Sequence, residues 1–151
     1  MRVLGVNNAK AEAQWQELPP PKVEKGQIRI QVEAAGLNRA DLLQIKGLYP
    51  GKVEIPVLGL ECSGIIDQIG EGVDEAWLGR KVCALLPGGG IAEYVACSPS
   101  VVVSVPNGLE LSLAAGLCET WCTALLNLWD QAAMVPKDKV LIHAGASGVG
   151  I

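Results

Sequence analysis

The sequence is poor in the side chains that bind structural zinc. It contains one histidine, His143, and none of its five cysteines belongs to a Cys-x-x-Cys pair. A structural zinc site needs four thiolate or imidazole ligands in a compact tetrahedral set. We therefore expect no metal. The cysteines are odd in number, widely spread and embedded in apolar runs, which is typical of reduced, buried thiols.

Clusters of basic residues are also missing. Twelve Lys and Arg stand against 16 Asp and Glu, giving a net charge of -4. Such a surface attracts neither the phosphates of nucleic acids nor an anionic bilayer. We therefore expect neither nucleic acid nor a membrane as a partner.

No segment resembles a secretion signal or a convincing membrane span. The first residues, Met1 to Asn8, have neither a long apolar core nor a small-residue cleavage site. Residues 109–129 are largely apolar, but Glu119 lies at their centre, where a charge costs on the order of 2.5–3.5 kcal/mol in a bilayer. We expect a buried soluble helix there and a cytoplasmic protein.

Short strands separated by turns dominate the first two thirds of the chain. Residues 27–35 alternate between apolar and polar, which is typical of a half-buried antiparallel strand. Further strands are predicted at 2–6, within 57–73, at 79–86 and at 91–96. The glycines in 57–73 indicate bulges and close backbone approach. The pattern predicts a partly open β-barrel.

Two helical regions interrupt this pattern. In residues 38–47, Asn38 is a plausible N-cap, Asp41 lies in the positive first turn and Gly47 can close the helix. Later, Ser112 is a credible N-cap, and Pro136 should end the second helical region. Between them one apolar face has helical spacing, formed by Trp121, Leu125, Leu128, Trp129 and Ala132.

The last stretch, residues 139–150, reads as a buried parallel strand followed by a glycine-rich turn. In a dinucleotide-binding βαβ unit, such glycines let the backbone approach the pyrophosphate, which is held at the N-terminus of the next helix. That helix should begin around Gly148 to Ile151. We therefore expect this chain to be the front part of a longer protein, and not a working enzyme by itself.

Four motifs in this order resemble the medium-chain dehydrogenase/reductase superfamily: Gly36-Leu-Asn-Arg-Ala-Asp, Gly59-Leu-Glu-Cys-Ser-Gly, Leu86-Pro-Gly-Gly-Gly-Ile-Ala-Glu-Tyr-Val and His143-Ala-Gly-Ala-Ser-Gly-Val-Gly. The resemblance covers essentially the whole chain and is greatest to the zinc-independent quinone oxidoreductases, in particular the p53-inducible group. It implies a mainly β protein with some α. Residues 1–118 would form a GroES-like domain, and residues 119–151 would begin a Rossmann domain.

The resemblance also implies a function. Zinc-dependent relatives have Cys and His where this chain has Asn38 and Leu60, so the hydride of NADPH would reduce a quinone without metal. Asn38 and Tyr49 are the implied catalytic residues. The implied cofactor-binding residues are Tyr49, Thr123, Gly145, Ser147, Gly148, Val149 and Gly150. Ser147 replaces the middle glycine of the commonest family loop, as it does in the p53-inducible group.

The sequence leaves several alternatives open. Asn38 could be only an N-cap and Thr123 an ordinary helix residue, while Glu61 is either a structural carboxylate, which we favour, or a group supporting the cleft. The substrate could be an enone or a 2-enoyl thioester, and NADH is not excluded. The chain could also be a non-catalytic GroES-like binding module. A homodimer is expected for the full-length protein.

Overall fold

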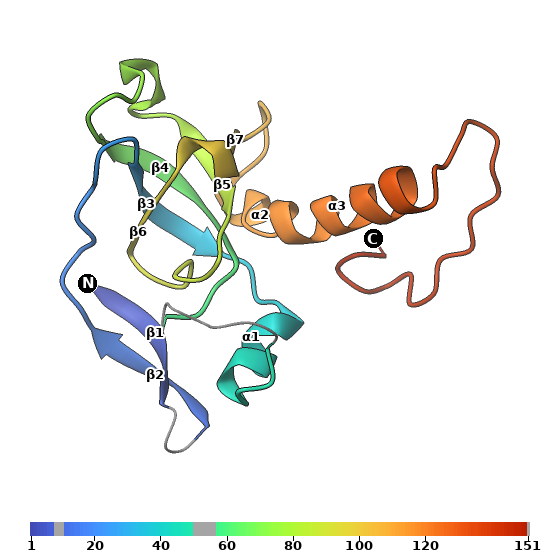
Figure 1. The fold of residues 1–151 in the computed structure, drawn as a ribbon, viewed down its shortest axis with the longest axis horizontal. Helices are drawn as coiled ribbons and strands as arrows, with labels where there is room; N and C mark the ends of the chain where they lie inside the picture. Colours follow the sequence, from blue (N-terminus) through green and yellow to red (C-terminus); the bar gives the residue numbers. More distant parts are fainter. Residues whose placement is uncertain (8–10, 50–56, 151) are drawn as a thin grey trace.

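The computed structural model describes residues 1–7, 11–49 and 57–150, and Figure 1 shows a β-rich body from which a helical arm extends. Within these residues the strands are β1 (Arg2–Asn7), β2 (Glu12–Glu17), β3 (Ile28–Ala35), β4 (Glu61–Ile69), β5 (Lys81–Leu85), β6 (Tyr94–Cys97) and β7 (Val102–Ser104). The α-helices are α1 (Arg39–Ile45), α2 (Leu111–Ala114) and α3 (Leu117–Leu125). Short 3-10 turns occupy Glu75–Trp77 and Pro99–Val101, and a π-helical segment, Leu126–Gln131, extends α3.

The strands form one large and one small sheet. The large sheet has the order β6-β3-β4-β5-β7, with every neighbouring pair antiparallel, and β1 and β2 pair with each other. Single bridges from Val3 to Ala92 and from Gly5 to Val57 attach β1 to the larger body. One apolar core runs from β6 to β7, because Val95, Cys97 and Val102 all pack in it. The predicted mainly β, barrel-like fold is confirmed.

The strand over residues 27–35 is confirmed as β3. Ile28 and Ile30 are completely buried, whereas Gln31 and Glu33 are exposed, so the apolar face is the inner one. Register shifts on β3 opposite β4 mark the predicted irregularities. A side chain at Gly64 on β4 would overlap the carbonyl oxygen of Gln31, so a glycine allows the two strands to approach there.

Helix α1 has the predicted boundaries. Asn38 is its N-cap residue, Asp41 lies in its first turn, and Gly47 follows it with φ +65°. The N–H groups of Gly47 and Leu48 donate to the carbonyls of Gln44 and Leu43, at 3.0 and 2.8 Å. This is the Schellman pattern, in which a glycine in the left-handed region closes the helix.

The second helical region differs from the prediction at both ends. Glu110, not Ser112, precedes α2, because its carbonyl accepts the N–H groups of Leu113 and Ala114 and closes the first turn. Ser63 on β4 holds α2 in place by donating its hydroxyl to the carbonyl of Leu111 at 2.5 Å. The helical conformation ends at Gln131, before Pro136, and Ala133 has a φ of +49°.

The apolar face of α3 was expected to be buried, and that expectation is wrong. Trp121 is 64% exposed and Trp129 is 55% exposed, and Leu125 is also exposed. Figure 1 shows the reason, since α3 projects away from the barrel and only its first turns lie near it. Cys118 is the buried residue of α3.

The predicted buried strand at residues 139–142 is not formed. Val140, Leu141 and Ile142 are exposed, and in the described part of the chain no strand pairs with them. A parallel strand exists only through its hydrogen bonds to neighbours. The thiol prediction is correct for Cys62, Cys83, Cys97 and Cys118, which are free and buried, and wrong for Cys122, which is free but exposed.

Candidate functional site

A buried carboxylate, Glu61, lies where α1 and α3 meet the barrel. It is the first residue of β4 and is 1% exposed. Its Oε1 accepts a hydrogen bond from the side-chain Nδ2 of Asn38 at 2.9 Å, and its Oε2 accepts one from the backbone N–H of Glu119 at 3.0 Å. Glu61 therefore has the backbone partner expected of a structural carboxylate and also contacts a predicted site residue.

Asp41 binds two backbone N–H groups beside the Asn38–Glu61 pair. Its Oδ2 accepts the backbone N–H of Asn38 at 2.7 Å, and its Oδ1 accepts the backbone N–H of Gly59 at 3.0 Å. The first contact confirms Asp41 as a helix-start charge. Asn38 is the N-cap by position, but its side chain makes no capping hydrogen bond because it is turned to Glu61.

Two glycines of the sequence motifs make room for this arrangement. A side chain at Gly36 would overlap the carboxylate of Glu61. Gly59 has φ +105°, and a side chain there would overlap the backbone nitrogen of Ile91. Both positions therefore need glycine, and the motifs around them are explained by the packing of Glu61 and of residues 59–60.

The site is rich in negative charge. Burial raises the pKa of Glu119 above its usual range, and the nearby carboxylates of Glu61 and Asp41 raise it further. A further anion would be repelled here, whereas a neutral group that accepts or donates hydrogen bonds would not. Asn38 is half-buried, and after its bond to Glu61 its amide keeps a carbonyl oxygen and one N–H for such a group.

The other predicted site residues of the barrel and α3 lie near these elements. Tyr49 follows α1, is half-buried, and precedes residues 50–56, which lie outside the described residues. Thr123 is half-buried on α3, one turn beyond Glu119, and its carbonyl accepts the side-chain Nδ2 of Asn127 at 2.7 Å. Within the described residues, hydrogen bonds connect Asn38 with α3 through Glu61 but do not connect it with Tyr49 or Thr123.

Residues 143–150, the predicted phosphate loop, form consecutive turns. The Oγ and the carbonyl of Ser147 both accept the N–H of Gly150, at 3.1 and 3.0 Å, as an N-cap accepts from the first turn of a helix. A side chain at Gly150 would overlap Gly145, so the turn closes around glycines. Gly145, Ser147, Gly148 and Val149 are exposed. The loop thus has the hydrogen bonds of a capped first turn, while Ile151 lies outside the described residues.

This loop lies against α3. A side chain at Gly148 would be 3.3 Å from the methyl carbon of Thr120, and Figure 1 shows the last segment returning toward the helix. The predicted cofactor residues of the loop are therefore near α3, whose first turn donates a hydrogen bond to Glu61. The sequence near Glu119 does not indicate the contact between α3 and Glu61, because the donor is a backbone N–H, which any residue type would provide.

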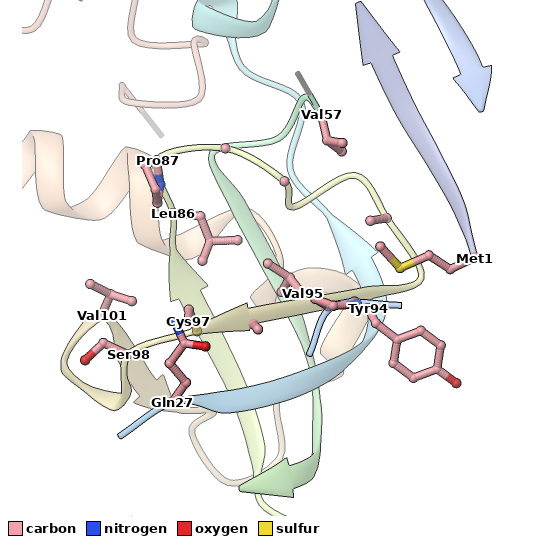
Figure 2. A pocket seen from close by; sticks show the side chains of 15 residues that line it. Met1, Gln27, Val57, Leu86, Pro87, Tyr94, Val95, Cys97, Ser98 and Val101 are labelled. Atoms are coloured by element: carbon pink, nitrogen blue, oxygen red, sulfur yellow. The ribbon is translucent and has the colours of Figure 1, made fainter. Parts of the chain in front are cut away.

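An apolar hollow of about 450 Å³ lies elsewhere, beside β6. Figure 2 shows Met1, Leu86, Pro87, Tyr94 and Val95 on its walls. Among the described residues that line it there is no predicted site residue. The hollow and the Glu61 site are therefore separate features of the barrel.

Leu60 is buried directly beside Glu61, so an apolar side chain and the amide of Asn38 occupy the two positions compared above with metal ligands. Within residues 1–7, 11–49 and 57–150, no three His, Cys, Asp or Glu side chains are grouped to hold a metal ion. No helix in the same ranges is long and apolar enough to span a bilayer.

Comparison with known proteins places the barrel in a family. The profile of the family "Alcohol dehydrogenase GroES-like domain" matches residues 24–107. A "Synaptic vesicle membrane protein VAT-1 homolog" of Danio rerio is 36% identical over 132 residues, which is 87% of this chain and 27% of that protein.

Solved structures agree with the fold. The CurK enoyl reductase has a TM-score of 0.87 and 32% identity, covering 99% of this chain and 48% of that one. The quinone oxidoreductase of Thermus thermophilus, solved also with NADPH, has a TM-score of 0.84 and 32% identity, covering 99% and 47%. The chain spans about half the length of these structures and matches their N-terminal part.

Proposed function

This chain belongs to the alcohol dehydrogenase GroES-like domain family, and from that premise we propose that it is the N-terminal part of an NADPH-dependent reductase that reduces a quinone without a metal ion. The observation that carries the proposal is the Asn38–Glu61 hydrogen bond. It places a neutral amide, anchored on a buried carboxylate, at the position where zinc-dependent relatives have a cysteine.

The residues of this chain would bind the cofactor and the acceptor and orient them toward each other. When NADPH is bound it supplies the hydride, so the protein needs no nucleophile or metal of its own. Ser147, Gly148 and Gly150 would hold the pyrophosphate with the N–H groups of the loop. Asn38, with its free amide groups, and Tyr49, with its phenol, would hydrogen-bond the acceptor oxygen or the nicotinamide, and Thr123 would line the cleft from α3.

A second candidate substrate has specific support. The enoyl reductase CurK is as similar in sequence to this chain as the Thermus quinone oxidoreductase, at 32% identity each. The alternative is therefore a reductase that transfers the same hydride to the β-carbon of an enone or 2-enoyl thioester. A non-catalytic GroES-like module is the third possibility.

Finer features are also part of the proposal. These are membership of the p53-inducible group, preference for NADPH over NADH, a cytoplasmic homodimer, and a division into residues 1–118 and 119–151. That division falls inside α3 (Leu117–Leu125), so the proposed domains would share a continuous helix at their junction.

The test is a substrate comparison with the full-length reductase, in the presence of a chelator. NADPH oxidation is followed with a quinone, with an enone and with a 2-enoyl thioester. The proposal expects the quinone to give the highest kcat/KM, and a higher value for either of the others would favour the alternative. Loss of all turnover to the chelator, restored by zinc, would contradict both.

A further inference from the structure

Glu61 connects three elements of the chain through its two oxygens. Oε1 accepts from the side chain of Asn38 at the start of α1, and Oε2 accepts from the backbone of Glu119 in α3, while Glu61 itself begins β4. With 1% exposure, the carboxylate does not face solvent.

This contact sets which way the amide of Asn38 points. A carboxylate oxygen only accepts, so the nitrogen of the amide must face Glu61 and its carbonyl oxygen must point elsewhere. The backbone of Asn38 is held as well, by the 2.7 Å bond from its N–H to Asp41. Asn38 is therefore fixed by both its main chain and its side chain, each time through a buried carboxylate.

The same carboxylate anchors the start of α3. Gly116 is the N-cap of α3 and has no side chain to accept the free N–H groups of the first turn. Glu61 accepts one of them, that of Glu119, from the barrel. Because Thr123 lies four residues further along the same helix, the position of Thr123 relative to Asn38 depends on Glu61.

We propose that Glu61 is a positioning residue of the reductase: it fixes the amide orientation of Asn38 and sets α3, with Thr123, against the barrel, so that both residues meet the ligand in a preset arrangement. The inference rests on the proposed function for the roles of Asn38 and Thr123. The two hydrogen bonds of Glu61 are properties of this chain and are tested separately.

The first arm of the test uses this chain and amide NMR. Glu61→Gln has nearly the same shape but offers one acceptor and one donor, so only one of the two N–H groups can stay bonded. We expect the side-chain amide of Asn38 or the backbone amide of Glu119 to shift and exchange faster with solvent. Asp67→Asn is the matched control, since Asp67 lies on the same strand and pairs with Arg29 at 2.7 Å, away from the site. Unchanged signals at both positions in Glu61→Gln would overturn the inference.

A second variant tests the same hydrogen bonds if Glu61→Gln does not fold. The double change Asn38→Asp/Glu61→Gln reverses the direction of the hydrogen bond between the two positions and leaves the net charge unaltered. It also leaves an acceptor at position 61 for the N–H of Glu119. We expect it to restore folding and the protection of the Glu119 amide. Failure to restore either would contradict the assigned bonds.

The second arm is a double-mutant cycle on kcat/KM in the full-length reductase. Glu61→Gln should lower kcat/KM about tenfold or more, because misplacing a positioning group costs on that order. In an Asn38→Ala background the same change should have a smaller effect, since the part of its action that passes through Asn38 is already lost. If the double change lowers kcat/KM by the product of the two single effects, the inference is overturned. If the unaltered protein reduces neither quinones nor enones, the proposed function fails, and the NMR arm still decides whether Glu61 orients Asn38.

Discussion

The backbone N–H of Gly59 donates a 3.0 Å hydrogen bond to the carboxylate of Asp41, tying the segment before β4 to helix α1. Asp41 is 4% exposed, and its second oxygen accepts the N–H of Asn38. Two backbone donors from different parts of the chain thus depend on one side chain. Because Gly59 is buried, its N–H loses its partner when that side chain is removed, so Asp41 should contribute more stability than an ordinary helix-start charge.

We predict that Asp41→Ala lowers the free energy of unfolding by about 2–4 kcal/mol, since the buried N–H of Gly59 left unpaired costs about 1–3 kcal/mol and the lost N-terminal contact to Asn38 about 1 kcal/mol more. Denaturant unfolding followed by circular dichroism measures it. The control is Asp74→Ala, which removes an exposed cap on the N–H of Ala76 and should cost about 1 kcal/mol or less. Equal losses in the two variants would show that the Gly59 contact contributes little.

Tyr49→Phe should lower quinone turnover or raise the KM for NADPH in the full-length reductase, while the melting temperature stays unchanged. The phenol is half-buried at the end of the α1 region, and losing one hydrogen bond to the ligand should cost about 1 kcal/mol. Steady-state kinetics with several quinones measure it. Identical kinetics for both proteins would reduce Tyr49 to a packing role.

This chain by itself should associate with a second copy through residues 112–144. Its exposed apolar side chains there include Leu113, Trp121, Leu125, Trp129, Val140, Leu141 and Ile142, a larger group than isolated surface apolar residues. Trp121→Glu should raise the dissociation constant at least about tenfold in sedimentation runs. Trp15→Glu is the matched control, because Trp15 is equally exposed, at 64%, but lies on β2. A clean monomer at every concentration would contradict this prediction.

Stability should fall as the pH rises above the usual thiol range. Burial raises the pKa of Cys62 to about 12 and that of Cys97 to about 11. In the unfolded chain a thiol ionises near pH ~8.5. Between that pH and the folded pKa values the folded state holds more protons than the unfolded state. The free energy of unfolding therefore decreases with rising pH over this window, by up to about 1.4 kcal/mol per pH unit for each thiol.

Urea unfolding at a series of pH values measures this slope. Cys62→Ala and Cys97→Ala should each make it shallower, whatever they do to stability at neutral pH. Cys122→Ala removes an exposed thiol and should leave the slope as it is. If Cys62→Ala and Cys97→Ala have the same slope as the unaltered chain, the loss of stability with rising pH comes from other groups.

The sequence predicts those elements whose signals are local. Ile28 and Ile30 alternate with polar residues and form a strand with that face buried, and Gly47 closes α1 because its φ is positive. Strand β2 cannot be predicted in this way, because its residues, Glu12–Glu17, are mostly polar and exposed. It is a strand because of its hydrogen bonds to β1. Apolar spacing identifies the apolar face of α3, but spacing does not say whether another element covers that face.

The candidate site divides in the same way. Asn38, Asp41 and Glu61 are each a polar residue in a glycine-containing motif, but of the three only Asn38 is predicted as a site residue from the sequence. Their connection could not be predicted, because it depends on backbone donors, Gly59 and Glu119, that any residue type would provide. Residues 139–142 are the opposite case. Their local pattern predicts a strand, but among the described residues no strand pairs with them.

The proposed function requires that nicotinamide hydride reaches the acceptor without a metal ion. The most direct measurement is the rate of quinone reduction by the full-length reductase with NADPH carrying deuterium in place of the transferred hydrogen, with and without a chelator. We predict a primary isotope effect on kcat/KM of the same size in both conditions. Turnover that the chelator abolishes and zinc restores would contradict the claim.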